Sequence, residues 1–479
     1  MELSLINRLF GFSVCVFSTA TMLAQETGAE VAGRKLLDPK RSFGFEFDPG
    51  HVSLVRNQYV AVRDSQGKHV VGRLFCRSGD NFGVVLLPSG ELNAYAIADL
   101  QITDQKFKPL TPLQLGNVIR TGDLARFNVK ASKNYVFIYN TSEGFFEVTK
   151  QILESMLAGM RRKLRDDGFD IHEPEVPFAV IMFANREQFQ AYSRQLTGNE
   201  SIPDGILAYY NMVTNHIVLY EPASSLNTSI DVVRGRALST IAHEGAHQIL
   251  HNIGIQQRLS MWPMWISEGL AEYYAPTSFG KKFRWKGAGV INDLRMFELE
   301  HYLQSRELLG LDGSTILDSV GAARLDSTGY ATAWSIVHYL AEKQPENLNR
   351  YIRYLSQLGP FYGMASHGSV VEENLEHFRQ FFGEDLIETE ANLISHLKSQ
   401  VYHSPLAFRP HFVTTVVFKD DGGEVKKKGC IYFQRNHAED WARAFYNSLQ
   451  PSQRESAQFE TVGFNTRDQA ARHLYLFLK

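Results

Sequence analysis

Two histidines and a glutamate interrupt an apolar helical pattern, and this feature constrains the fold more than any other. In residues 232–254 (VVRGRALSTIAHEGAHQILHNIG), small and apolar side chains recur at helical spacing up to Gly254, which we expect to cap the helix. Burying an ionisable side chain without a partner is costly. The stretch therefore predicts either a helix that brings these side chains to a bound ion, or an amphipathic helix with two surface histidines.

The spacing of the three side chains favours an ion. His243 and His247 lie one helical turn apart, so both imidazoles point the same way and can reach one metal. Neutral imidazole is a good zinc ligand, and Glu244 is placed to take a proton from a water on that ion. H-E-x-x-H thus predicts one Zn²⁺, with Glu244 as general base. His251 is about 12 Å from His243 along a straight helix, too far to share the ion.

A third ligand is expected from the segment MWPMWISEGLAEYYAP (261–276). Pro263 suits a helix start, and apolar residues mark a packed face. Glu268 and Glu272 are four residues apart and share one side of this helix. His-His-Glu with one position left to water is a catalytic zinc arrangement, so we predict Glu268 as the ligand. Glu272 would hold a ligating histidine through its other ring nitrogen. The alternative is two acids on a solvated face.

The two motifs together resemble those of a known class. HEGAH, followed after a 20-residue gap by the Glu of WISEGLAEYY, resembles the gluzincin metallopeptidases, the thermolysin-like and aminopeptidase-like branch of the zincins. Residues from about 135 to 400 also resemble an uncharacterised peptidase-MA-like family of exported bacterial proteins, through VIMF, YYNMVTNHIVLY, HEGAHQ and WISEGLAEY. The resemblance implies an α+β fold with a zincin-like (thermolysin-type) core at 130–400. It also implies His243, His247 and Glu268 as ligands, with Glu244 as base.

The chain departs from this class in two places. The amine-recognition motif G-x-M-E-N of the zinc aminopeptidases is absent upstream, so we expect an endopeptidase rather than an exopeptidase. No motif marks the thermolysin-type histidine that stabilises the oxyanion. A tyrosine fills that role in several gluzincins, and TGYATAWSIVHYL (328–340) offers Tyr330 at a helix start. The alternative for Tyr330 is a packing residue.

The N-terminus predicts export. Residues 1–24 have Arg8, an apolar stretch and then small residues, which is typical of a signal peptide. No later run is long enough to span a membrane, so we expect a periplasmic or extracellular protein without stable membrane insertion. An uncleaved anchor is the alternative. The net charge of -3 and the lack of a basic run argue against nucleic acid as a partner.

The flanking regions have different patterns. Residues 25–41 are polar and predict a linker, and 42–112 show short strands with turn signals, similar to SH3-like modules. Residues 405–479 predict a small α/β domain of unknown role. Within the core, 207–220 predict a hairpin whose second strand, 216–220, could be a sheet edge that pairs with a peptide. Cys76 and Cys430 allow either one long-range disulfide or two thiols.

The sequence thus predicts a secreted or periplasmic zinc metallopeptidase that acts on a peptide or protein substrate. Two alternatives remain open at this point. One is a non-catalytic binding or scaffold protein that retains a metallopeptidase fold, and the other is a metal-dependent hydrolase of non-peptide substrates. Glu244 favours an enzyme, because a structural metal site needs no carboxylate beside its water.

Overall fold

The computed structural model describes residues 30–31, 34–48, 50–55, 57–64, 67–196, 203, 205–223, 230–278, 284–309, 314–322, 325, 327–363 and 370–479. The predicted signal peptide, 1–24, lies outside these residues. The chain divides into two compact units, Met1–Val290 with Ser319–Glu384, and Ile291–Asp318 with Asp385–Lys479. The second unit therefore takes in segments that the sequence analysis assigned to the core at 130–400. Within the described ranges, no helix has the length and apolarity needed to cross a membrane.

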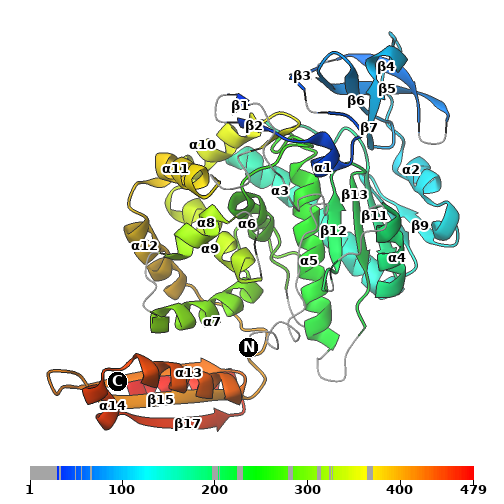
Figure 1. Ribbon diagram of the computed structural model, residues 1–479. Helices are drawn as coiled ribbons and strands as arrows, with labels where there is room; N and C mark the ends of the chain where they lie inside the picture. The colour runs from blue at the N-terminus through cyan, green and yellow to red at the C-terminus, as the bar shows by residue number, and fades with distance from the viewer. Residues whose placement is uncertain are drawn as a thin grey trace. The chain divides into compact units, whose positions relative to one another are not determined.

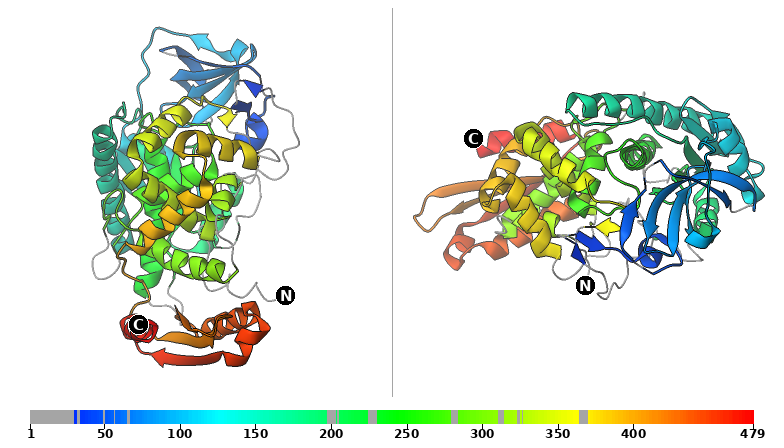
Figure 2. Two further views of the ribbon diagram at one scale, coloured as in Figure 1. Left: turned by 90° about the vertical axis from the view of Figure 1, so that its left-hand side faces the viewer. Right: turned by 90° about the horizontal axis from the view of Figure 1, so that it is seen from above.

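An antiparallel β domain lies in the N-terminal part of the first unit and is drawn in blue in Figures 1 and 2. The strand order is β7-β6-β5-β4-β8, with β3 paired to β5. Val60, Leu74 and Val85 form the centre of its apolar core. Short strands were predicted at 42–112, and the strands of this domain lie within that range. Their bounds are β3 (Val52–Leu54), β4 (Tyr59–Arg63), β5 (His69–Ser78), β6 (Phe82–Leu86), β7 (Leu92–Ala96) and β8 (Gln101–Ile102).

A five-stranded mixed sheet follows in the same unit. Its order is β12-β13-β11-β10-β9, with β10, β11 and β13 parallel and both outer strands antiparallel to their neighbours. Helices α2 (Pro112–Ile119) and α4 (Arg186–Leu196) contact the sheet, and α3 (Glu143–Asp166) connects β10 to β11. The strands are β9 (Asn128–Ala131), β10 (Tyr135–Tyr139), β11 (Phe178–Phe183), β12 (Ala208–Asn211) and β13 (His216–Tyr220).

The hairpin 207–220 is confirmed, but the prediction that 216–220 is a sheet edge is wrong. Strand β13 lies between β12 and β11, so β12 is the edge strand. Both strands are apolar, and the sequence alone did not indicate which of the two pairs with β11. Strand β13 pairs in parallel with β11 on one side and antiparallel with β12 on the other, so β13 is buried between them and β12 is left at the edge.

The helix that carries the H-E-x-x-H motif, α5 (Ile230–Leu250), packs among other helices of the first unit. Helix α5 contacts α3, β12 and α6 (Met264–Tyr274), and α6 packs along α9 (Ser327–Lys343). Glycines allow the closest approaches. A Cβ on Gly245 would lie 2.5 Å from the Leu153 side chain, and one on Gly269 would lie 2.6 Å from the Ala333 carbonyl oxygen. Helices α10 (Pro345–Ser356) and α11 (Val370–Phe382) complete this layer.

The segment predicted as a linker, 25–41, is ordered where it is described. Strands β1 (Glu30–Val31), β2 (Arg34–Leu36) and β14 (Tyr362–Gly363) form a small antiparallel sheet, and α1 (Pro39–Phe43) follows. The rings of Phe43, Phe45 and Phe47 then contact Phe361. The linker prediction is therefore corrected, because pairing with a strand more than 300 residues away leaves no local sequence signal.

The second unit contains a three-stranded antiparallel sheet in the order β16-β15-β17. Helix α13 covers one face through Trp441, and α15 covers the other through Ala470. The elements are α7 (Asp293–Leu309), α12 (Leu386–Lys398), β15 (His411–Lys419), β16 (Val425–Tyr432), α13 (Arg435–Ser448), α14 (Pro451–Ser456), β17 (Gln458–Phe464) and α15 (Arg467–Leu478), with α8 (Ser314–Gly321) crossing the unit boundary.

Cys76 and Cys430 are both free thiols, and burial raises the pKa of each to about 12.

Candidate metal centre

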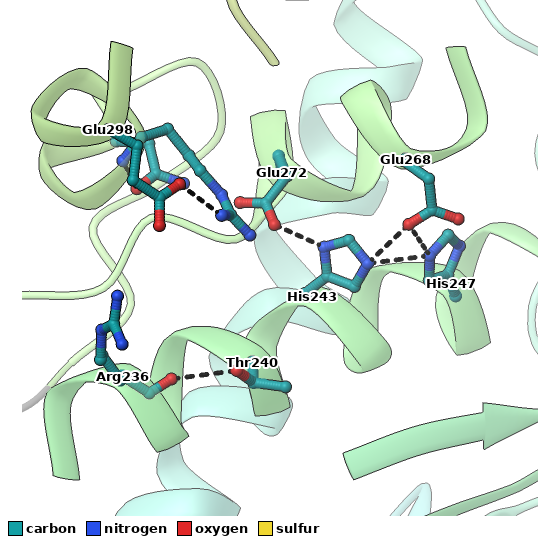
Figure 3. Close-up of polar contacts among 9 residues, drawn as sticks. Arg236, Thr240, His243, His247, Glu268, Glu272 and Glu298 are labelled. Atoms are coloured by element: carbon teal, nitrogen blue, oxygen red, sulfur yellow. Dashed lines mark hydrogen bonds and ion pairs between the residues drawn. The ribbon is translucent and has the colours of Figure 1, made fainter. Parts of the chain in front are cut away.

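Helix α5 brings its two histidines together as the motif spacing predicts. His243 and His247 lie one turn apart, and their Nε2 atoms are 3.1 Å from each other. Both side chains are almost fully buried, with exposed fractions of 2% and 3%. Gly245 lies between them in the sequence and lets α3 approach α5 closely, so this part of α5 is held by packing. Figure 3 shows both imidazoles directed toward α6.

Helix α6 supplies the carboxylate that meets the two imidazoles. Glu268 Oε2 lies 3.0 Å from His243 Nε2 and 3.4 Å from His247 Nε2. The side chain is fully buried, and its second oxygen, Oε1, has no hydrogen-bond partner among the described residues. Gly269 packs closely against α9, and this contact holds the turn of α6 that carries Glu268. The structure thus brings together the three residues that the sequence analysis proposed as ligands (Figure 3).

These three atoms fit a divalent metal ion. In a tetrahedral zinc site with bonds of about 2.0–2.1 Å, two ligand atoms are separated by about 3.3 Å. The three separations of 3.0, 3.1 and 3.4 Å are close to that value. His243, His247 and Glu268 form the one group of potential metal ligands found within the described part of the chain. Two nitrogens and one carboxylate oxygen are also ligands that zinc accepts.

The charge of the site also favours a cation. Glu244, Glu268 and Glu272 bring three carboxylates to a region in which none is more than 2% exposed. Buried negative charge needs compensation by a cation or by protons. Neutral imidazoles provide no such charge. A divalent ion held by the two histidines and Glu268 would supply it.

Glu272 contacts the other side of the first histidine. Its Oε1 atom lies 2.9 Å from His243 Nδ1, and its side chain is 2% exposed. It comes from the turn of α6 that follows Glu268, so both acids reach His243 from one helix face (Figure 3). A carboxylate on Nδ1 fixes the ring orientation and leaves Nε2 directed at the Glu268 side. This is the geometry that the sequence analysis predicted for Glu272.

The histidine and the acids shift each other's pKa. Burial alone would lower the pKa of His243, but the carboxylates of Glu272 and Glu268 outweigh it and raise that pKa to about 10. Burial alone would raise the pKa of Glu268, but His247 and His243 hold it well below its ordinary value. Without a metal, a protonated imidazole therefore neutralises part of the acidic cluster. A divalent ion would take over that role.

Glu244 is held by the edge strand. The backbone N–H of Tyr210 donates to Glu244 Oε2 at 2.8 Å, and the Glu244 side chain is 1% exposed. Sequence reasoning missed this contact, since a backbone amide carries no residue-specific signal. The Tyr210 hydroxyl donates to Asn215 Oδ1, and the Nδ2 group of Asn252 on the α5 side donates to the same oxygen. This buried network connects α5 with the hairpin that contains β12.

Tyr330 lies beside the first histidine. It occupies the first turn of α9, its side chain is 1% exposed, and its ring centroid is 5.8 Å from that of His243, edge to face. By contrast, His251 follows the end of α5 and stacks on Tyr210, with ring centroids 5.6 Å apart. His251 is not part of the group of potential ligands.

Residues 237–362 match the family DUF1570. That family is described as a protein of unknown function. The matched stretch holds both histidines, Glu244, Glu268, Glu272 and Tyr330, so all of the candidate site residues fall inside it. Among curated proteins, none matches the chain.

Proposed function

We propose that this protein is an exported zinc-dependent peptidase that hydrolyses internal bonds of a peptide or protein substrate. One observation carries the proposal. The Nε2 atoms of His243 and His247 and the Oε2 atom of Glu268 lie within 3.4 Å of one another. A further carboxylate, that of Glu244, comes from the same helix as the two histidines and is not part of this group. A purely structural site has no use for that extra acid. Export is supported by the N-terminal sequence, and an endopeptidase by the missing amine-recognition motif.

His243, His247 and Glu268 would hold the ion. Bound there, a zinc ion would supply Lewis-acid chemistry toward a carbonyl oxygen and a water. Glu244 would accept a proton from the water whose oxygen bonds to the carbonyl carbon, and would pass it to the amine that leaves as the C–N bond breaks. The Tyr210 amide keeps the Glu244 carboxylate in place through this transfer. The Tyr330 hydroxyl is our candidate donor to the oxyanion, a contribution of about 2.7–4 kcal/mol where such a donor has been removed from enzymes.

The edge strand β12 is the proposed docking element for an extended substrate. In an antiparallel ladder, alternate residues turn their N–H and C=O groups away from the partner strand. Tyr210 is such a residue, because its N–H donates to Glu244. Ala208, two residues earlier, therefore also faces outward and can pair with a peptide.

Hydrogen–deuterium exchange tests this docking element. We expect a peptide hydroxamate inhibitor to slow exchange in β12. The matched control is β9, the strand at the opposite edge of the same sheet, which should not respond. Unchanged exchange at 208–211 with the inhibitor bound would rule out docking on β12.

A single substitution tests the activity. The Glu244→Gln variant should bind zinc as the wild type does and should lose hydrolysis of a denatured protein substrate. A Glu268→Ala variant, measured in parallel, should lose zinc. Full zinc occupancy without hydrolysis in the wild type would instead favour a non-catalytic scaffold. Hydrolysis of a non-peptide ester, but of no peptide, would favour the other alternative.

A further inference from the structure

A second polar site lies within the first unit, at the end of the segment that follows helix α5. A cavity of about 100 Å³ is lined from the N-terminal β domain by Arg73 and from the rest of the unit by Glu175, His251, Asn252 and Arg258. A single water needs roughly 10–15 Å³ of such space. The cavity therefore has room for a small organic ion as well as for a few waters.

His251 is the first indication that the cavity holds a ligand. Its side chain is 5% exposed, and neither ring nitrogen has a hydrogen-bond partner among the described residues. A neutral imidazole presents one N–H donor and one acceptor. Leaving both unsatisfied in a buried place is costly.

Arg258 is the second indication. Its guanidinium is 4% exposed and donates to backbone carbonyls only. Nε donates to Met212, Nη2 to Met212 and Val213, and Nη1 to Gly90. These bonds use four of its five N–H groups, so one Nη1 hydrogen has no partner in the described part of the chain.

The charges around the cavity do not balance. Arg73 and Glu175 form a bidentate pair, with both contacts at 2.7 Å, and so neutralise each other. The guanidinium of Arg258 forms no bond to a carboxylate, and Glu91 and Glu175 act on it only at longer range. The walls therefore present one positive charge in excess. A single negative charge in the cavity would offset this excess at short range, where Arg258 has no carboxylate partner.

We propose that this cavity binds a small monocarboxylate anion. Its carboxylate would accept hydrogen bonds from the N–H of His251 and the remaining Nη1 hydrogen of Arg258, both of which line the cavity. Arg258 also holds the Gly90 carbonyl of the β domain. A bound anion would therefore tie the β domain to the end of the helix that carries the metal motif. The site does not depend on zinc or on peptidase activity.

Calorimetric titration of the full-length protein with sodium acetate tests the site. Sodium chloride at equal ionic strength and the neutral isostere acetamide serve as reference titrants. We expect saturable binding of one acetate, and no binding of acetamide or chloride. The variant His251→Phe keeps a flat ring without the N–H and should weaken acetate binding by at least about tenfold, the loss typical of one charge-assisted hydrogen bond. His251→Gln, which keeps a donor, should recover part of it.

The matched control is His403→Phe, an equivalent change at a histidine whose side chain is 89% exposed in the other unit. It should bind acetate as the wild type does. Three results would overturn the proposal. These are no saturable acetate binding, equal responses to acetate and acetamide or chloride, and equal affinity in wild type and His251→Phe. If His251→Phe fails to fold, the acetate titrations of the wild type and of His251→Gln still show whether the cavity binds acetate through residue 251.

Discussion

Removal of the Glu272 carboxylate should weaken zinc binding although Glu272 is not placed to touch the ion. Its Oε1 atom lies 2.9 Å from His243 Nδ1, on the side of the ring opposite Glu268. Both side chains are 2% exposed, so water cannot replace the lost contact without entering the core. The substitutions Glu272→Gln and Glu272→Ala separate two effects. Glutamine keeps an oxygen that can accept from Nδ1 but loses the charge, whereas alanine loses both.

The size of the effect follows from the kind of contact. Changing a partner that orients a metal-binding histidine typically costs 10–100-fold in metal affinity, or about 1.4–2.7 kcal/mol. We expect Glu272→Gln near the lower value, because the ring orientation is retained, and Glu272→Ala near the upper value. The order of the two variants is part of the prediction.

Zinc affinity is measured by competition with a chromogenic chelator on the purified variants. Glu342→Gln is the matched control, since this glutamate is exposed on the neighbouring helix α9 and should leave affinity unchanged. Circular dichroism checks that each variant is folded. If both Glu272 variants bound zinc within about twofold of the wild type, the orienting role of Glu272 would be refuted.

Three further changes address packing, catalysis and pH. Gly269→Ala should lower the free energy of unfolding by about 1–3 kcal/mol in urea, because its Cβ would lie 2.6 Å from the Ala333 carbonyl oxygen. Gly144→Ala, whose Cβ meets nothing within 4 Å, should not lower it, and equal effects would contradict this reading. Tyr330→Phe should lower kcat roughly 10²–10³-fold with zinc content and KM nearly unchanged, and an unchanged kcat would exclude the oxyanion role. Burial lowers the pKa of His216 to about 4, below the unfolded value, so the folded state disfavours its protonation. The metal-free protein should therefore lose stability as pH falls from about 6.5 toward 4. His216→Gln should reduce that loss, and an identical pH profile would argue against this assignment.

The parts of the fold that sequence predicts well are those determined by near neighbours. The helix expected in 232–254 is present as α5 (Ile230–Leu250), because its apolar periodicity is local. The approach of His243 to His247 follows from helix geometry alone. Glu268 lies on a second helix, but it could still be found from the sequence. It is an acid within an apolar helical pattern, and a buried acid needs a partner.

The parts that sequence reasoning missed depend on contacts between distant segments. The apolar strands of the 207–220 hairpin do not reveal that the second one pairs with β11. Strand β2 is too short and too polar to be recognised until β14 is beside it. The amide of Tyr210 and the carbonyls that hold Arg258 belong to the backbone, which every residue shares. A sequence can thus indicate which ionisable side chains need partners, as it did at His243 and Glu268. Where the partner is a backbone group or a small ligand, as at Glu244 and His251, only the packing of the chain identifies it.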